Sequence, residues 1–131
     1  MSFNGSILIV DDEPHIRKFV TLLVRQLGAP TIHEAADGEE ALAIYDRERP
    51  DLVLLDISMP LMDGLEALQR LRIMDPDATV IMLTSMANRQ SVEQALEHGA
   101  VNYLRKDLPK DEMLKALAET IAAVFDGGEK P

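Results

Sequence analysis

The sequence predicts an α/β fold, a doubly wound sheet of five parallel strands with helices on both faces. Two observations lead to this prediction. Five short apolar segments alternate with stretches in which apolar residues recur at helical spacing. Three of the five segments are apolar throughout, which is typical of strands buried on both faces. Because crossovers between parallel strands usually contain a helix, this alternation favours a parallel sheet.

The order of the strands follows from their polarity. The first, third and fourth segments are continuously apolar, whereas the second (TIHEA) and the fifth (VNYL) contain polar residues and fit the sheet edges. Placing these two outermost predicts the order 2-1-3-4-5 of flavodoxin-like (βα)5 folds. The predicted strands are Ile7–Val10, Thr31–Ala35, Leu52–Leu55, Val80–Leu83 and Val101–Leu104.

Five predicted helices connect and follow these strands. The first four end at helix-breaking residues, namely Gly28, Pro50, Asp75-Pro76 and Gly99. Right-handed crossovers would place the first and fifth helices on one face of the sheet and the other three on the opposite face. The apolar positions that define the helices are, in order, Ile16, Phe19, Val20, Leu23 and Leu27; Ala41, Leu42 and Tyr45; Leu65, Leu68 and Leu71; Val92, Ala95 and Leu96; and Met113, Leu114, Leu117, Ile121 and Val124.

Composition and charge narrow the functional classes. A hydrophobic content of 47% is typical of a globular chain. With 13 basic and 23 acidic residues the net charge is −10, which argues against direct binding of nucleic acid. The sequence has no cysteine, which excludes disulfides and thiolate metal sites. No apolar run reaches the roughly 20 residues of a membrane span, and the start MSFNGS lacks signal-peptide features. We therefore expect a soluble, cytoplasmic protein.

The length of 131 residues suits a single domain. We expect one domain over residues 1–131, with a core of about residues 6–124. The segment FDGGEKP at residues 125–131 is typical of a helix exit and predicts a flexible tail, or the point at which a longer protein was cut.

Polar residues follow four of the five predicted strands. Asp11 and Asp12 follow the first, Asp56 the third, Thr84 the fourth and Lys106, after one arginine, the fifth. In open parallel sheets, ligands bind beyond the carboxyl ends of the strands. We therefore expect three carboxylates, a hydroxyl and an ammonium group at one edge of the sheet.

This set of groups predicts a metal-assisted phosphoryl site. At about 4 Å and an effective dielectric constant near 20, each pair of carboxylates repels by on the order of 4 kcal/mol. A hard divalent cation relieves that repulsion, and Mg²⁺ usually takes one or two carboxylates, water and a phosphate oxygen. A lysine and a threonine would then serve the remaining phosphoryl oxygens.

Each residue alone has an ordinary explanation. Asp11 and Asp12 could cap the following helix, which starts near a proline. Asp56 could be a turn residue, Thr84 a hydroxyl at a strand end, and Lys106 a solvated charge. The occurrence of all of them at four separate strand ends favours the phosphoryl site.

Four motifs contain these residues: LIVDDEP, LVLLDISMPLMDG, IMLTS and NYLRK. In this order and spacing they resemble the receiver domain of bacterial two-component response regulators, the CheY-like family, over about Ser6–Val124. The resemblance implies a phosphorylation-controlled signalling switch in a phosphorelay, not an enzyme, although it would assist its own phosphorylation and slow dephosphorylation. Asp56 would accept the phosphoryl group from a sensor histidine kinase or a histidine phosphotransfer protein.

The resemblance also implies the metal ligands. Asp12 and Asp56 would bind Mg²⁺ directly, for which Mn²⁺ can substitute, together with the backbone carbonyl of Ser58. Asp11 would reach the ion mainly through water.

The resemblance further implies how the phosphoryl group is sensed. Lys106 would pair with Asp56 at rest and with the phosphoryl group afterwards, and Thr84 would donate to a phosphoryl oxygen. Movement of Thr84 would let Tyr103 fill the space behind it, which would repack the face formed by the fourth helix, fifth strand and fifth helix, where a downstream partner docks. The alternative for Tyr103 is an ordinary half-exposed aromatic residue on an edge strand.

The sequence departs from the family pattern near the site. Lys106 is followed by Asp107, where the family usually has a proline with a cis peptide. Because a cis bond before a non-proline costs about 2.5–4 kcal/mol, we expect a trans or altered loop, which leaves the pose of Lys106 open. Ser58 and Met86 lie two residues after Asp56 and Thr84, at positions that tune self-dephosphorylation in the family. The side chain of Met86 cannot orient a water, so we expect a long-lived phosphoryl group.

The methionines and the charge pattern bear on partners. Transcriptional receivers usually dimerise through an acidic pair before the tyrosine of the fifth strand and arginines along the fifth helix. This sequence has Val101-Asn102 and, at residues 113–116, MLKA instead, so the charged dimer interface is not expected. Met82 fits a core position, whereas Met59 and Met62 could contact a kinase or a phosphotransfer helix.

Three other functions fit the sequence less well. A phosphatase with an aspartyl-phosphate intermediate would usually have a second aspartate where Ser58 stands. A phosphorylation-independent interaction module would not need Asp12, Asp56, Thr84 and Lys106 together. A nucleotide- or flavin-binding domain would need a glycine-rich loop after the first strand, which the sequence lacks.

Overall fold

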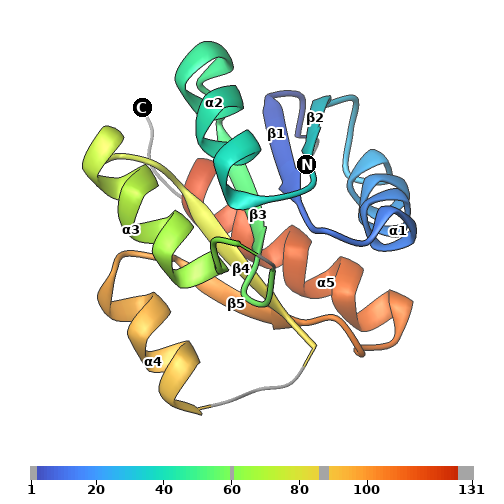
Figure 1. Cartoon of the computed structure of the whole chain (residues 1–131). Helices are drawn as coiled ribbons and strands as arrows, with labels where there is room; N and C mark the ends of the chain where they lie inside the picture. Colours follow the sequence, from blue (N-terminus) through green and yellow to red (C-terminus); the bar gives the residue numbers. More distant parts are fainter. Residues whose placement is uncertain (1–2, 60, 86–88, 127–131) are drawn as a thin grey trace.

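The structure, a computed structural model, describes residues 3–59, 61–85 and 89–126, and Figure 1 shows its five strands and five α-helices. The strands are β1 (Ser6–Val10), β2 (Thr31–Ala35), β3 (Leu52–Asp56), β4 (Val80–Thr84) and β5 (Asn102–Arg105). The helices are α1 (Pro14–Arg25), α2 (Gly38–Glu48), α3 (Gly64–Met74), α4 (Arg89–Glu97) and α5 (Lys110–Ile121), and a π-helical turn η1 (Ala122–Asp126) continues α5.

The five strands form one parallel sheet in the order β2-β1-β3-β4-β5, which confirms the predicted topology. Every residue of β3 and β4 is buried, as expected for central strands with helices on both faces. The polar strands β2 and β5 lie at the edges.

Five strand limits differ from the prediction by one residue, including the start of β1 (Ser6) and the end of β5 (Arg105). β3 extends to Asp56 and β4 to Thr84, because Asp56 still pairs with Leu83 and Thr84 with Arg105. β5 begins at Asn102 instead of Val101. The prediction placed polar residues outside the strands, but ladder pairing depends on the backbone and continues through them.

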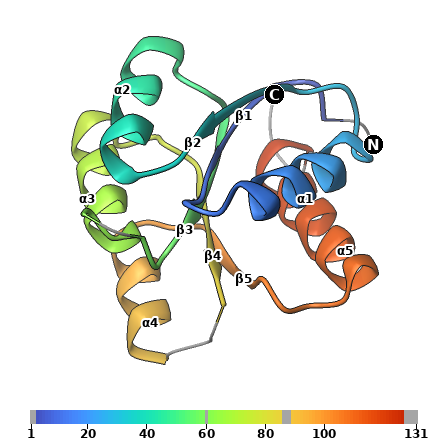
Figure 2. The ribbon, with the colours of Figure 1, turned by 45° about the vertical axis from the view of Figure 1, so that its right-hand side comes forward.

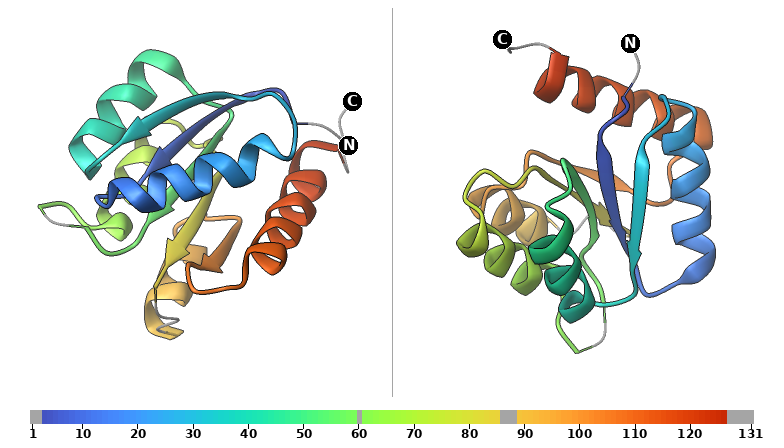
Figure 3. Two further views of the ribbon diagram at one scale, coloured as in Figure 1. Left: turned by 90° about the vertical axis from the view of Figure 1, so that its right-hand side faces the viewer. Right: turned by 90° about the horizontal axis from the view of Figure 1, so that it is seen from above.

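The helices form two layers, as predicted. Figure 2 shows α1 and α5 on one face of the sheet and α2, α3 and α4 on the other, and the right panel of Figure 3 shows the sheet between α1 and the pair α2 and α3. Each layer has its own apolar core. Val20, Leu23 and Met113 belong to the α1/α5 side, and Ala41 and Leu68 to the opposite side.

The end of α1 was predicted wrongly. The helix ends at Arg25 with Gln26 as its C-cap, whereas the sequence favoured Gly28. Gly28 has a different role: it has φ = +154°, and a Cβ at this position would collide with the backbone oxygen of Phe3. The glycine is needed because the N-terminal segment packs against it, where the backbone N–H of Phe3 donates to the carbonyl of Leu27 (2.6 Å).

The C-terminal helix continues past the predicted core. Phe125 lies in η1, and its ring contacts that of Phe3 with centroids 5.2 Å apart. In the described residues, no helix is both long enough and apolar enough to span a membrane.

Candidate functional site

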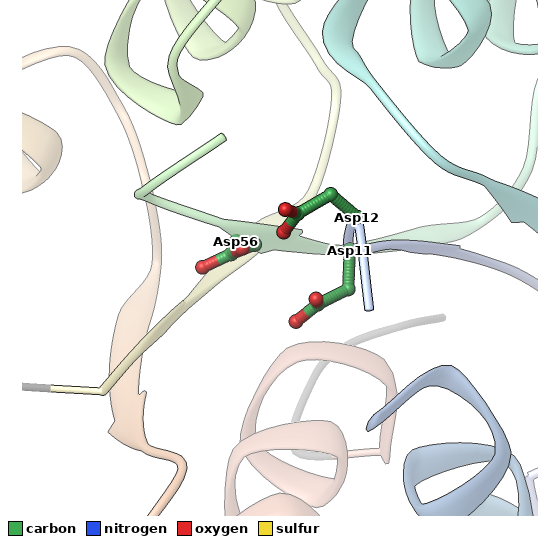
Figure 4. A group of neighbouring side chains, drawn as sticks. All are labelled: Asp11, Asp12 and Asp56. Carbon is green, nitrogen blue, oxygen red and sulfur yellow. The ribbon is translucent and has the colours of Figure 1, made fainter. Parts of the chain in front are cut away.

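Three aspartates meet at the carboxyl edge of the sheet. Asp11 and Asp12 follow β1, and Asp56 is the last residue of β3, the strand next to β1. Carboxylate oxygens of the three residues lie within 4.8 Å of one another, and Figure 4 shows the three side chains grouped at the strand ends. Asp11 and Asp56 are buried, whereas Asp12 is exposed. The structure therefore brings together all three predicted carboxylate ligands.

Lys106 joins two of these carboxylates. Its Nζ lies 2.6 Å from Oδ2 of Asp11 and 3.0 Å from Oδ1 of Asp56, and its side chain is only 11% exposed. The backbone N–H of Lys106 donates to the carbonyl of Thr84 (2.7 Å), so the end of β4 helps to place the lysine. The expected pair with Asp56 is present, while the shorter contact with Asp11 was not predicted.

Asp56 has one engaged and one unengaged oxygen. Oδ1 contacts Lys106 and accepts from the backbone N–H of Ser58 (3.3 Å). Oδ2 is buried and has no hydrogen-bond partner among the described residues. A buried carboxylate oxygen without a donor is unfavourable unless a cation or another group approaches it. This oxygen and the two neighbouring acids therefore fit a hard divalent cation.

The electrostatic environment raises the pKa of Asp56 from 3.8 to about 6. Burial is the main cause, and the charge of Asp11 adds to it, while Lys106 and the Ser58 N–H act in the opposite direction. Burial also lowers the pKa of Lys106, but its contacts with Asp11 and Asp56 outweigh this effect and raise the pKa overall. Asp56 is therefore an ionised, poorly solvated carboxylate near neutral pH, which is suitable for a nucleophile.

The two acids after β1 do not act as the cap of α1. The helix begins at Pro14, and its N-cap residue is Glu13, whose side chain makes no capping hydrogen bond. Oδ1 of Asp11 instead accepts from the backbone N–H of Glu13 (2.9 Å), which holds the loop in a tight turn over the end of β1. The ordinary explanation for this acidic pair, a helix cap, is thus not supported.

The loop after β3 folds back over Asp56. The backbone N–H of Gly64 donates to the carbonyl of Ile57 (2.7 Å), and a Cβ at Gly64 would collide with the carbonyl oxygen of Asp56. Asp63 and Gly64 lead into α3, and Oδ1 of Asp63 caps the helix by accepting from the N–H of Glu66 (2.9 Å). Glycine is therefore required at this close approach.

The methionines of this loop differ in exposure. Met62 is only 6% exposed and packs in the core against Gly38, so its predicted role as a kinase contact is wrong. Met82 is fully buried, as expected, and Met59 is partly buried. Among the described residues of this loop, Leu61 is the exposed apolar one, with 90% exposure and a positive φ of 70°. Pro60 and Met86 lie outside the described residues.

The loop after β5 has only trans peptides, as expected from Asp107. The guanidinium group of Arg105 binds the Asp107 carboxylate through two contacts, of 3.0 and 2.6 Å, across the intervening Lys106. Tyr103, the predicted switch residue, is 36% exposed and pairs in register with Met82.

Two residues near the site were missed at the level of sequence. Arg17 reaches the backbone carbonyl of Asp11, but an arginine one turn into a helix carries no pattern that reveals such a contact. Leu61 would have been found only if its left-handed backbone had been predictable, and a leucine gives no such signal.

Fold and site together define a class of protein. The sheet has the 2-1-3-4-5 order, and its carboxyl edge carries three grouped aspartates and a lysine paired with two of them. Such a site suits the transfer of a phosphoryl group to an aspartate, the chemistry of a signalling phosphoacceptor domain.

The comparison with protein families gives the same result: residues 7–118 match the response regulator receiver domain, and the chain belongs to this family. It is 40% identical over 111 residues to the chemotaxis protein CheY of Listeria monocytogenes, covering 85% of this chain and 93% of that protein. It is 39% identical over 114 residues to sporulation initiation phosphotransferase F of Bacillus subtilis, covering 87% of this chain and 91% of that protein.

Among solved structures, the chain is similar to the CheX–CheY–BeF₃–Mg²⁺ complex of Borrelia burgdorferi, with a TM-score of 0.83 and 35% identity over 92% of this chain and 88% of that chain. The chain is thus a receiver domain of two-component signalling and not a conventional enzyme. Receiver domains generally bind Mg²⁺ in an acidic pocket and interact with kinases, phosphotransfer proteins and downstream partners, and the three grouped aspartates are consistent with such a pocket.

Proposed function

We propose that this chain is a phosphorylation-controlled switch in a phosphorelay and that Asp56 accepts the phosphoryl group from a histidine kinase or a histidine phosphotransfer protein. The observation that supports this most strongly is the state of the Asp56 carboxylate. One oxygen is held by Lys106 and by the N–H of Ser58, and the other is buried without a partner beside two more acids.

In the transfer, an oxygen of Asp56 attacks the phosphorus atom of the phosphohistidine. The new O–P bond forms as the P–N bond breaks, and the bonding electrons return to the imidazole ring of the donor. Lys106 already contacts both Asp11 and Asp56, so a small movement brings its charge to the phosphoryl oxygens. Thr84, at the end of β4, donates its hydroxyl to another of these oxygens.

The metal site would consist of Asp11, Asp12, Asp56 and the backbone carbonyl of Ser58. A bound Mg²⁺, or Mn²⁺ in its place, supplies neutralisation of the negative charge on the phosphoryl oxygens. Asp12 and Asp56 would bind directly, and Asp11 mainly through water.

The output of the switch is a change in partner binding. Engagement of Thr84 by the phosphoryl group draws Tyr103 inward and repacks the face of α4, β5 and α5, where a downstream protein docks. The receiver domain acts in the cytoplasm and does not bind nucleic acid itself, in keeping with the net charge of −10.

The first test is the intact mass of the protein after incubation with acetyl phosphate and Mg²⁺. We expect the wild type to gain one phosphoryl group, and we expect no gain for Asp56→Asn or for wild type in EDTA. Asp77→Asn, the same change at an exposed aspartate outside the site, is the matched control and should gain the group normally. Absence of a gain in wild type that demonstrably binds Mg²⁺ would refute the switch and favour a phosphorylation-independent interaction module.

A further inference from the structure

Arg17 connects three elements beside the acidic site without contacting its carboxylates. Nη1 donates to the backbone carbonyl of Asp11 (2.7 Å), and Nε pairs with Oε1 of Glu34 (2.9 Å). Arg17 lies in the first part of α1, Asp11 follows β1, and Glu34 is in β2. The side chain of Arg17 is 17% exposed, whereas the arginines of the other described ion pairs are 47% to 93% exposed. This contact is therefore unusually sheltered for a surface arginine.

The carbonyl that Arg17 holds belongs to the peptide that joins Asp11 to Asp12. The same backbone is also fixed by the N–H of Asp11, which donates to the carbonyl of Ala35 (3.1 Å). In the part of the chain that the structure describes, no hydrogen bond orients the exposed carboxylate of Asp12. Because the peptide is planar, a hydrogen bond that fixes its carbonyl oxygen also fixes the position of the Asp12 Cα atom. The orientation of the Asp12 side chain thus depends on the backbone segment that Arg17 holds in place.

Charge compensation does not explain Arg17. A residue that served to neutralise the acids would contact their carboxylates, as Lys106 does. The guanidinium group instead contacts a neutral carbonyl, and the charge of Glu34 offsets its own. Arg17 therefore acts on the site mainly by orienting the backbone and not by neutralising charge.

We propose that Arg17, oriented by Glu34, is a positioning residue that sets the Asp11–Asp12 peptide so that the Asp12 carboxylate can complete a Mg²⁺-sized site. This inference rests on the proposed function, because it takes Asp11, Asp12 and Asp56 as the metal site. Residues that orient metal ligands typically change metal affinity by about 10–100-fold when they are removed. Mg²⁺ requires nearly ideal octahedral geometry, whereas Ca²⁺ accepts longer and less regular contacts. Loss of Arg17 therefore weakens Mg²⁺ binding more than Ca²⁺ binding.

The test is calorimetric titration of Mg²⁺ and, separately, of Ca²⁺ into wild type and variants. We expect Arg17→Ala to raise the Kd for Mg²⁺ by about 10–100-fold and the Kd for Ca²⁺ by a smaller factor. Arg17→Lys keeps the charge, but a single ammonium group cannot contact the Asp11 carbonyl and Glu34 as the guanidinium group does. We therefore expect its Mg²⁺ affinity to lie between those of wild type and Arg17→Ala. Glu34→Gln retains an oxygen that accepts from Nε and stays close to wild type. Arg70→Ala is the matched control, because it removes an exposed arginine that pairs with Glu66 on α3.

The inference is overturned by a Kd for Mg²⁺ of Arg17→Ala within twofold of wild type. It is also overturned by equal loss of Mg²⁺ and Ca²⁺ binding, which would indicate general loosening. If far-UV circular dichroism shows that Arg17→Ala does not fold, Arg17→Lys must itself show the selective loss of Mg²⁺. Failure of the proposed function gives a different result: wild type would not bind Mg²⁺, or Asp12→Asn would bind it as wild type does.

Discussion

Replacement of Asp56 by asparagine should stabilise the metal-free protein, and the gain should depend on pH. The environment raises the pKa of Asp56 from 3.8 to about 6, chiefly through burial. One pKa unit corresponds to about 1.4 kcal/mol, so ionising this group in the folded state costs roughly 3 kcal/mol. Solvent screening at the edge of the sheet lowers this figure to about 2 kcal/mol. Asparagine keeps an oxygen that can accept from Ser58 and Lys106 but carries no charge.

The sign follows from proton linkage. Between pH 3.8 and about 6 the folded state holds a proton on Asp56 that the unfolded state has lost. The stabilising effect of this proton is complete below pH 3.8 and is lost as the pH rises through about 6. The free energy of unfolding of Asp56→Asn should therefore come close to that of wild type near pH 4 and exceed it by about 2 kcal/mol at pH 7.5.

The assay is urea unfolding in EDTA, followed by circular dichroism at a series of pH values. Asp77→Asn is the control, since it makes the same change at an exposed aspartate and should show no such trend. A difference between Asp56→Asn and wild type that stays constant from pH 4 to 7.5, or a variant that is less stable than wild type at pH 7.5, would refute the reasoning.

Three further predictions concern other parts of the molecule. Tyr45→Phe removes the hydrogen bond from the phenol to Asp75 (2.7 Å), which lowers the pKa of that carboxyl; we expect it to reduce the free energy of unfolding by about 1 kcal/mol. This loss of stability should shrink as the pH falls through the lowered pKa of Asp75. Urea unfolding at acidic pH is the measurement, and an undiminished loss there would contradict the prediction. Asp107→Ala removes the two contacts between the Asp107 carboxylate and Arg105 on either side of Lys106. Phosphorylation by acetyl phosphate, followed by intact mass over time, should slow several-fold. An unchanged rate would show that the Arg105–Asp107 pair does not hold Lys106 in place. The phosphoryl group on the wild type should persist well beyond minutes in Mg²⁺, and decay within minutes would show that water is oriented efficiently at the site.

The fold could be predicted well from the sequence because the polarity of each strand alone indicates its place in the sheet, and this pattern occurs in all five strands. Each continuously apolar strand indicates burial on both faces, and the polar strands TIHEA and VNYL indicate edges, so the strand order follows without any knowledge of long-range contacts. The site was predictable for a related reason. Parallel strands deliver their carboxyl ends to one edge, so Asp11, Asp56 and Lys106 meet although they are far apart in sequence.

The details that the sequence did not reveal depend on contacts between distant segments. Gly28 seemed to be a helix cap, but its requirement comes from Phe3, whose backbone packs against it. Met62 seemed to be available to a partner, but the space beside Gly38 receives its side chain. Arg17 gave no signal, because its partner in the site is a main-chain carbonyl, and every residue has one.

The double contact of Lys106 has a consequence for the resting protein. Its ammonium group lies between two buried carboxylates and serves as their internal counter-ion. The lysine therefore offsets part of the repulsion between Asp11 and Asp56. Under the proposed function, an incoming divalent ion would have to compete with this lysine for Asp11 and Asp56, so the lysine would set how readily the site takes up metal.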